Sequence, residues 1–236
     1  DHRDLHSFPT RRSSDLKDDI AAIIIEPIQG EGGDNHFRNE YLKQLRTIAD
    51  ENDILLIFDE VQTGLGLTGT MWAHEQMEVK PDIMVFGKKT QVCGIVVTDR
   101  IDEVPENVFH TSSRINSTWG GNIVDMARIT KYLEIMEEDR ILDNVNIQSK
   151  YLVSSLFVIQ NQFPELIENI RGRGLMCAFD FPDSKQRSAF INKSFENGLI
   201  ILPCGEKSVR FRPPLNITEQ DLQDGLEIVK DILKKI

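Results

Sequence analysis

The sequence predicts an α/β protein: a large domain with a mostly parallel sheet, followed by a smaller α+β domain. Two short apolar runs, at 54–58 and 83–86, have the length and composition of buried strands, and a helix-length segment separates them. Each run is followed by a residue that can do chemistry, Asp59 after the first and Lys88 after the second. Ligands bind at the carboxyl ends of strands in open α/β sheets, so we expect both side chains at one crevice.

Length and charge exclude several classes of protein. At 236 residues the chain can bury a sizeable core, in one large domain or two small ones. Its 27 Lys and Arg against 38 Asp and Glu give a net charge of −11, which argues against nucleic-acid and anionic-membrane partners. No apolar run approaches the roughly 20 residues that a bilayer-spanning helix needs. The 3 cysteines, widely spaced and without a CxxC pair, indicate a cytoplasmic location, and no metal site is predicted.

The start of the chain does not fit this fold. Segment 1–16 has no apolar periodicity, and its part 6–16 resembles the translation of a sequencing adapter, so we exclude it as a non-native or disordered leader. Three parts are then expected: a partial large domain over 17–125, connecting helices over 126–150 and a small C-terminal domain over 151–236.

Periodicity and turn residues predict the elements of the large domain. A β-branched run at 21–25, ended by a proline, predicts a buried strand, and the glycine-rich loop after it carries Glu31. Apolar residues at helical spacing predict a helix over 39–52 that crosses to the next parallel strand. The other elements expected here are a short helix at 72–77, a strand at 94–98 and irregular chain over 104–116.

The remaining elements lead into and form the smaller domain. Helices are predicted over 123–138 and 141–163, because apolar residues recur on one face and Pro164 ends the second helix. Alternating polar and apolar positions within a strand at 175–181 indicate a sheet with one face covered. The other elements expected are strands at 167–171, 199–202 and 209–211 and helices at 184–197 and 218–235.

A carboxylate and a lysine at one crevice suit pyridoxal phosphate. The lysine amine forms a Schiff base with the cofactor's aldehyde, and the carboxylate keeps the pyridine nitrogen protonated, so that the ring accepts electrons. Taken singly, each residue has a plainer explanation. An apolar run before Asp59 and Glu60 is also typical of the metal-binding strand of a P-loop ATPase, and Lys88 could be an ordinary loop lysine. The chain contains no GxxxxGKS or GxxxxGKT loop, which leaves the ATPase as a distant alternative.

Two phrases favour the pyridoxal-phosphate interpretation. FDEVQTGLGLTG at 58–69 and FGKKTQVCG at 86–94 closely resemble the class III pyridoxal-phosphate-dependent aminotransferases. The resemblance covers essentially 21–236 and implies the fold of the type I pyridoxal-phosphate transferases with its N-terminal portion missing. The gene would then extend upstream of Lys17, and the family's phosphate-binding glycine-serine turn and stacking aromatic residue would lie there.

The resemblance assigns roles to individual residues. Lys88 would be the Schiff-base lysine, and Asp59 the partner of the pyridine nitrogen. Val61 would pack on the cofactor ring, and Gln62 would contact its phenolic oxygen. Thr118 would reach the phosphate in the other subunit, which implies a homodimer with shared sites. Without the resemblance, Gln62 could equally be a turn-capping amide and Thr118 an N-cap or turn hydroxyl.

Lys89 is the obvious rival of Lys88 for the Schiff base. We prefer Lys88 because it follows the glycine directly, as the family's lysine does. Lys89 would point the other way if the backbone is still extended there.

The phrase RFRPPLNIT at 210–218 carries the last motif. Arg210 and Arg212 share one face of a predicted strand, and a guanidinium binds a carboxylate through two parallel charged hydrogen bonds. The plain alternative is a pair of solvated arginines. The resemblance assigns the substrate carboxylate to Arg210 and leaves Arg212 unassigned. It also pairs Arg210 with Glu31, otherwise a solvated loop acid, which would move aside when the other substrate arrives.

The resemblance implies amino transfer from the terminal amine of L-lysine to 2-oxoglutarate, giving 2-aminoadipate 6-semialdehyde and glutamate. The choice of lysine rests on the segment FGKKTQVCG and on the sequence of the C-terminal part of the chain. Ornithine, 4-aminobutyrate and other ω-amine transaminases share the pattern Asp59, Gln62, Lys88 and Arg210. A parallel sheet without some of its strands would expose an apolar edge or face, so an inactive fragment is a competing hypothesis.

Overall fold

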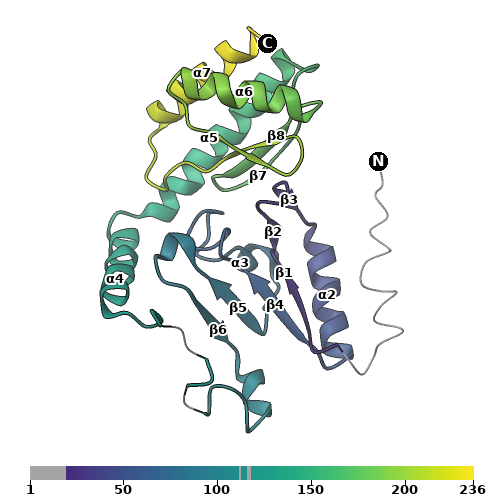
Figure 1. Ribbon diagram of the computed structural model, residues 1–236, viewed down its shortest axis with the longest axis vertical. Coiled ribbons are helices and arrows are strands. Elements are labelled where there is room, and N and C mark those ends of the chain that lie inside the picture. The colour runs from purple at the N-terminus through teal and green to yellow at the C-terminus, as the bar shows by residue number, and fades with distance from the viewer. Residues whose placement is uncertain (1–19, 112, 116–117) are drawn as a thin grey trace.

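The computed structural model describes residues 20–111, 113–115 and 118–236, so the predicted leader at 1–16 lies outside the described residues. Within these ranges the chain forms two units, each built on a four-stranded sheet (Figure 1). The first sheet has the order β1-β4-β5-β6, and the second has the order β7-β8-β10-β9. The prediction of an α/β unit followed by a smaller α+β unit is confirmed.

The first sheet is mostly parallel, as predicted. Its strands are β1 (Ala22–Ile25), β4 (Leu55–Asp59), β5 (Ile83–Phe86) and β6 (Gly94–Val97). The first three run parallel, and β6 pairs antiparallel with β5. α2 (Asn39–Glu51) connects β1 to β4 and buries Leu42, Leu45 and Ala49, because its apolar residues recur on one face.

Apolar side chains remain exposed on the edge strands of this sheet. Ile24 of β1 is 67% exposed, and Ile95 and Val96 of β6 are also exposed. Proteins usually cover or charge such edges, because unpaired strands invite association. In the described part of the chain, the two outer strands of this sheet, β1 and β6, therefore carry exposed apolar side chains.

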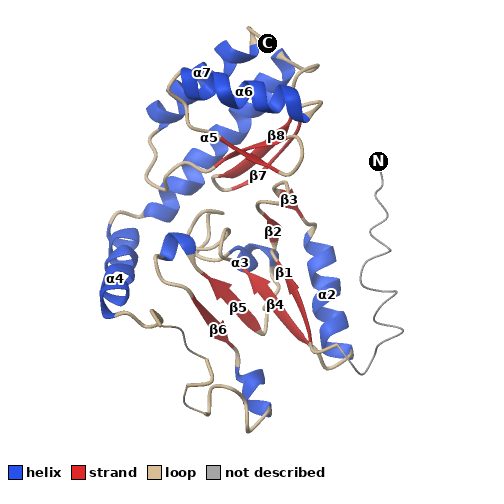
Figure 2. Cartoon of the chain, viewed as in Figure 1, coloured by secondary structure: helices blue, strands red, loops and turns tan. Residues whose placement is uncertain are grey.

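Short elements at the strand ends face the second unit. β2 (Ile28–Gln29) and β3 (Asn35–His36) form a small hairpin where the sequence predicted only a loop. α3 (Ala73–Met77) and the 3₁₀ turn η2 (Lys88–Thr90) follow β4 and β5 on this side, whereas η3 (Asp99–Glu103) follows the antiparallel β6 and lies at the opposite end of the sheet (Figure 2). The arrowheads of β4 and β5 point toward the second sheet (Figure 2), so the loops after these strands lie between the two units.

Two long helices, α4 (Ile123–Glu138) and α5 (Ile141–Gln162), lead into the second unit. The predicted connecting segment 126–150 corresponds to most of α4 and the first part of α5, which continues without a break. No helix in the described part of the chain is long and apolar enough to cross a membrane.

The second sheet is antiparallel throughout. Its strands are β7 (Glu168–Arg173), β8 (Met176–Asp180), β9 (Leu202–Cys204) and β10 (Ser208–Phe211). The strand expected at 199–202 is wrong in position. The Leu199 N–H donates to the Ser194 carbonyl at 2.8 Å, so Leu199 belongs to the turn that closes the C-terminal end of α6 (Ser184–Glu196), and the strand begins only at Leu202.

Helices α5, α6 (Ser184–Glu196) and α7 (Glu219–Leu233) lie on the side of the second sheet that faces away from the first unit (Figure 1). Beneath them Phe179, Phe181 and Phe190 are fully buried, and the rings of Phe181 and Phe190 are 5.1 Å apart. The other side of this sheet is turned toward the strand ends of the first unit, and the candidate site lies there.

Candidate active site

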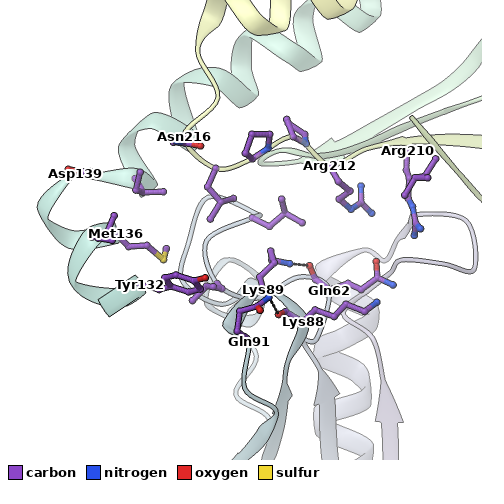
Figure 3. A pocket seen from close by; sticks show the side chains of 18 residues that line it. Gln62, Lys88, Lys89, Gln91, Tyr132, Met136, Asp139, Arg210, Arg212 and Asn216 are labelled. Carbon is purple, nitrogen blue, oxygen red and sulfur yellow. Dashed lines mark hydrogen bonds between the residues drawn. The ribbon is translucent and has the colours of Figure 1, made fainter. Parts of the chain in front are cut away.

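A cavity of about 810 Å³ lies between the two units. The first unit contributes Gln62, Lys88 and Lys89, and the second contributes Arg210 and Arg212. The two arginines point from the second sheet toward Lys88 and Gln62 (Figure 3). The apolar part of the wall includes Leu65, Leu67, Met136, Ile141, Pro213, Pro214 and Leu215. Gln62, Lys88 and Arg210, which the sequence placed at one site, line this one cavity.

Lys88 is presented by a strained turn after β5. Its φ of 53° lies in the left-handed region, which residues other than glycine rarely adopt. Gly87 before it is needed for space, because a Cβ there would lie 3.0 Å from Cys93 Sγ and 3.5 Å from a Val61 methyl. The turn therefore presents Lys88 at the end of β5, beside the cavity between the two units.

Lys89 lines the same cavity as Lys88, because the extended backbone on which its opposite orientation depended is absent. The backbone is not extended after Gly87, because residues 88–90 form a 3₁₀ turn and successive side chains no longer alternate. Lys89 Nζ donates to the main-chain carbonyl of Gln62 at 2.6 Å, whereas Lys88 is exposed. Burial, helped by the positive charges of Arg212 and Lys88, lowers the pKa of Lys89 to about 8.

Asp59 lies at the end of β4, beside the strand that leads to Lys88. It is paired in register with Val85 of β5, and its Oδ1 accepts the Val61 N–H at 3.0 Å. Its carboxylate lines a separate cavity of about 290 Å³, shared with Gln29. The structure therefore brings Asp59 and Lys88 to neighbouring strand ends but not into one cavity.

Gln62 packs against the glycine-rich loop of the first unit. A Cβ on Gly30 would lie 2.5 Å from the Gln62 side-chain amide, so a larger residue at position 30 would displace that amide. The loop that carries Glu31 and the loop after β4 are thereby held together.

Glu60, which gave the strand its resemblance to an ATPase, caps a helix. It is buried and accepts hydrogen bonds from the N–H groups of Ala73 and His74 at 2.6 and 2.9 Å, at the start of α3. The Thr63 hydroxyl also donates to it at 2.9 Å. A carboxylate at the N-terminus of a helix satisfies donors that would otherwise lack partners. The acidic residue after Asp59 therefore has a structural explanation.

Two ion pairs, which we call the seam, join the β2–β3 hairpin to β10 and the residue after it. Arg210 Nη1 lies 2.7 Å from Glu31 Oε2, and these are the two residues that the resemblance pairs. Both terminal nitrogens of Arg212 donate to the Asp34 carboxylate. The Glu31 side chain is 73% exposed, whereas that of Asp34 is 0% exposed. The seam therefore joins one exposed and one buried carboxylate to two arginines of similar exposure, 14% for Arg210 and 20% for Arg212.

Arg171 and Gly205 hold the hairpin turn against the second unit. Arg171 donates from Nε to the Asp34 carbonyl at 2.9 Å and from Nη2 to the Gly33 carbonyl at 2.6 Å. The Gly205 N–H donates to the Glu31 carbonyl at 2.8 Å, and a Cβ on Gly205 would lie 2.8 Å from Gly33 Cα. The sequence did not indicate these contacts, because their partners are far apart along the chain.

Thr118 lies apart from these residues. It is exposed, precedes α4 and lines neither the 810 Å³ nor the 290 Å³ cavity. Within a single chain, the structure does not bring Thr118 to Lys88.

Comparison with known families agrees with this arrangement. The aminotransferase class-III family matches residues 3–233. The chain belongs to the class-III aminotransferases. This membership decides against the ATPase alternative, and it agrees with the fold described above.

Several class-III aminotransferases are similar to the chain along most of its length. The L-lysine-epsilon aminotransferase of Amycolatopsis lactamdurans is 51% identical over 209 residues, which are 88% of this chain and 46% of that protein. The solved structure of the lysine aminotransferase from M. tuberculosis has a TM-score of 0.90 at 48% identity, covering 92% of this chain and 50% of that one. Human mitochondrial 4-aminobutyrate aminotransferase is 36% identical, over 92% of this chain and 43% of its own. The chain thus spans about half the length of the class-III aminotransferases that it matches.

Proposed function

We propose that this chain is part of a transaminase that uses pyridoxal phosphate to move the terminal amino group of L-lysine to 2-oxoglutarate. One observation carries the proposal: Lys88, on its strained turn, shares a cavity with Arg210, which an exposed carboxylate covers. The 51% identity to an L-lysine-epsilon aminotransferase supports lysine as the donor. The 36% identity to a 4-aminobutyrate aminotransferase keeps another ω-amine donor as the alternative.

The residues at the strand ends fit pyridoxal phosphate. Lys88 offers an amine for the cofactor's aldehyde. In the described part of the chain Asp59 forms no ion pair, so its carboxylate suits a protonated ring nitrogen. Val61, between Asp59 and Gly87, and the Gln62 amide would complete the contacts. When bound, the cofactor would supply the electron sink that allows a proton to leave the substrate carbon.

Lys88 and Asp59 would do different work in this reaction. The Lys88 amine would take the proton from the substrate carbon that bears the amine, and Nζ would deliver it to the cofactor carbon that receives the amino group. General acid–base help of this kind contributes about 10²–10⁴-fold in rate. Asp59 would hold a positive charge at the end of β4, where a low dielectric strengthens the ion pair.

The two substrates would place different demands on Arg210. Lysine would react through its terminal amine, far from its carboxylate, whereas 2-oxoglutarate carries a carboxylate at each end. With Glu31 in place, Arg210 is neutralised and suits lysine. With Glu31 swung into solvent, Arg210 offers its guanidinium to a carboxylate of 2-oxoglutarate.

We extend the proposal to the whole protein. Thr118 would bind the cofactor phosphate of the partner subunit in a homodimer, which its exposed position away from its own cavity supports. The domain boundaries would be those expected above, 17–125, 126–150 and 151–236, and the location would be the cytoplasm.

The test follows the visible absorbance of the protein loaded with pyridoxal phosphate. L-Lysine, L-ornithine and 4-aminobutyrate are added in separate cuvettes, and rapid bleaching by lysine alone is expected. Bleaching by another amine would keep the chemistry and change the donor. A chain that stays folded and never acquires a visible band would contradict the proposal and favour an inactive fragment.

A further inference from the structure

Arg210 and Arg212 both line the cavity that Lys88 lines, two residues apart on one side of the chain. Two guanidinium groups so placed would offer two binding sites to the carboxylates of a substrate. We propose that Asp34 determines specificity by masking Arg212 permanently, so that Arg210 is the carboxylate receptor that the Glu31 pair controls. This inference rests on the function proposed above.

Burial makes the Asp34 pair permanent. Asp34 is fully buried, and both terminal nitrogens of Arg212 donate to it. Its main chain is held on two sides, because its N–H donates to the Gly30 carbonyl at 3.0 Å and its carbonyl accepts from Arg171 at 2.9 Å. If Asp34 left Arg212, a buried carboxylate would lose its charged partner, which is among the costliest changes a protein can undergo.

Exposure makes the Glu31 pair reversible. The Glu31 side chain is 73% exposed, so water can solvate its carboxylate when it leaves Arg210. Within the described ranges its main chain is held through its carbonyl, by the Gly205 N–H at 2.8 Å, and that bond does not restrict the side chain. The same hairpin thus carries one carboxylate that can leave and one that cannot.

The mask matters for both substrates because of the charges around the cavity. Lys88, Lys89, Arg210 and Arg212 contribute cationic groups, the seam carboxylates Glu31 and Asp34 offset two of them, and Asp139 adds a carboxylate at the wall. An unmasked Arg212 would attract a dicarboxylate even with Glu31 in place. It would also repel lysine, whose two amines give it a net positive charge. By masking Arg212, Asp34 would thus prevent the dicarboxylate acceptor from binding at the expense of lysine.

The test measures binding of glutarate, a dicarboxylate without an amine or a keto group, by titration calorimetry on the cofactor-loaded chain. Asp34→Asn keeps the shape of the side chain and removes its charge. We expect it to raise the affinity for glutarate roughly tenfold to a hundredfold, the worth of charged hydrogen bonds to a freed guanidinium. The double variant Asp34→Asn/Arg212→Gln should return to the parent affinity. Glu31→Gln, which frees Arg210, is the matched control and should also bind more tightly.

Three outcomes would overturn the inference. Suppose that the Asp34→Asn protein has the same melting temperature as the parent and binds glutarate no more tightly. This result would show that Arg212 is not masked. A double variant that binds at least about tenfold more weakly than the parent would make Arg212 a receptor already in the parent. If no variant, including Glu31→Gln, bound glutarate, the proposed carboxylate site itself would fail. A fourth outcome, in which Asp34→Asn binds tightly and Glu31→Gln does not, would overturn the control of Arg210 by Glu31 and support the masking of Arg212.

A chemical measurement decides the matter if Asp34→Asn does not fold. Phenylglyoxal modifies accessible guanidinium groups, and mass spectrometry of chymotryptic peptides locates the modified arginine. In Glu31→Gln, whose substitution lies at an exposed side chain, we expect Arg210 to react and Arg212 to stay protected. Equal reaction of the two arginines would contradict masking.

Discussion

The ends of β4 and β5 with Asp59 and Lys88, which we call the strand-end region, differ from the seam in how their side chains are positioned. In the strand-end region, Asp59 and Lys88 are placed by main-chain geometry, since two parallel strands in register end side by side and a strained turn presents the amine. In the seam, positions depend on two ion pairs between the hairpin and the second sheet, and the carboxylates of those pairs differ in exposure. Under the proposed function, the first region would set whether amino transfer occurs, and the second would set which substrate is accepted. Substitutions in the two regions should therefore have distinguishable effects.

The largest effect is expected at Lys88. Lys88→Ala should lower the rates with L-lysine and with L-glutamate alike, by on the order of 10²–10⁴-fold, because it removes the group that moves the proton. Single-turnover absorbance measurements with each amine would check this. Lys89→Ala is the matched variant, because Lys89 lines the same cavity but is held by Gln62. A larger loss from Lys89→Ala than from Lys88→Ala would reverse the assignment.

Asp59 tests whether the strand-end region acts on both partners equally. Asp59→Asn should slow both amines by on the order of 10²–10³-fold, the size expected when one preorganised charge is removed from an active site. The same single-turnover assay applies, with retention of the bound cofactor measured in parallel. If one amine slowed while the other did not, Asp59 would belong with the recognition residues.

Arg210 should behave in the opposite way. Arg210→Gln should raise the KM for 2-oxoglutarate by roughly 10–100-fold, because charged hydrogen bonds to a carboxylate are lost. The KM for lysine should change much less. The KM of each substrate, measured separately from kcat, would show this asymmetry. Equal changes for both substrates would place Arg210 with the strand ends and end the distinction between the two regions.

The smallest effect concerns pH and Lys89. Burial lowers the pKa of Lys89 to about 8 from an ordinary 10.5, so between these values the unfolded chain holds a proton that the folded chain has released. This group's contribution to the free energy of unfolding therefore rises as the pH rises from 8 to 10.5. Acetylation of Lys89 at a series of pH values, followed by peptide mass spectrometry, should show half-maximal reactivity near pH 8. A midpoint at the ordinary value would mean that Lys89 is solvated.

The sequence predicted the strand-end region better than the seam, for a physical reason. The apolar runs that form β4 and β5 can be recognised from the local sequence. Neighbouring parallel strands then end at the same edge of the sheet, which places Asp59 and Lys88 close together. Asp59 and Lys88 could therefore be found from spacing and residue type. The orientation of Lys89 could not, because the left-handed φ of Lys88 starts a 3₁₀ turn that no local pattern marks.

The seam depends on contacts between distant parts of the chain. Arg212 was visible as a second arginine on the face of Arg210, yet its partner Asp34 lies in a loop that the sequence showed only as glycine-rich. Arg171 gave no signal, since its acceptors at Gly33 and Asp34 are more than a hundred residues away. Packing between two sheets, which a single sequence does not display, decides these pairs.

The comparison between the two regions is tested most directly at Glu31. The rate of the visible absorbance change is measured with L-lysine and with L-glutamate, in the parent and in Glu31→Gln. Because Glu31 covers Arg210, the substitution should change the two rates unequally, favouring glutamate over lysine by roughly tenfold, the worth of a charged hydrogen bond. If the ratio of the two rates stayed at its parent value, the Glu31–Arg210 pair would not select between partners, and the division of labour between the two regions would be wrong.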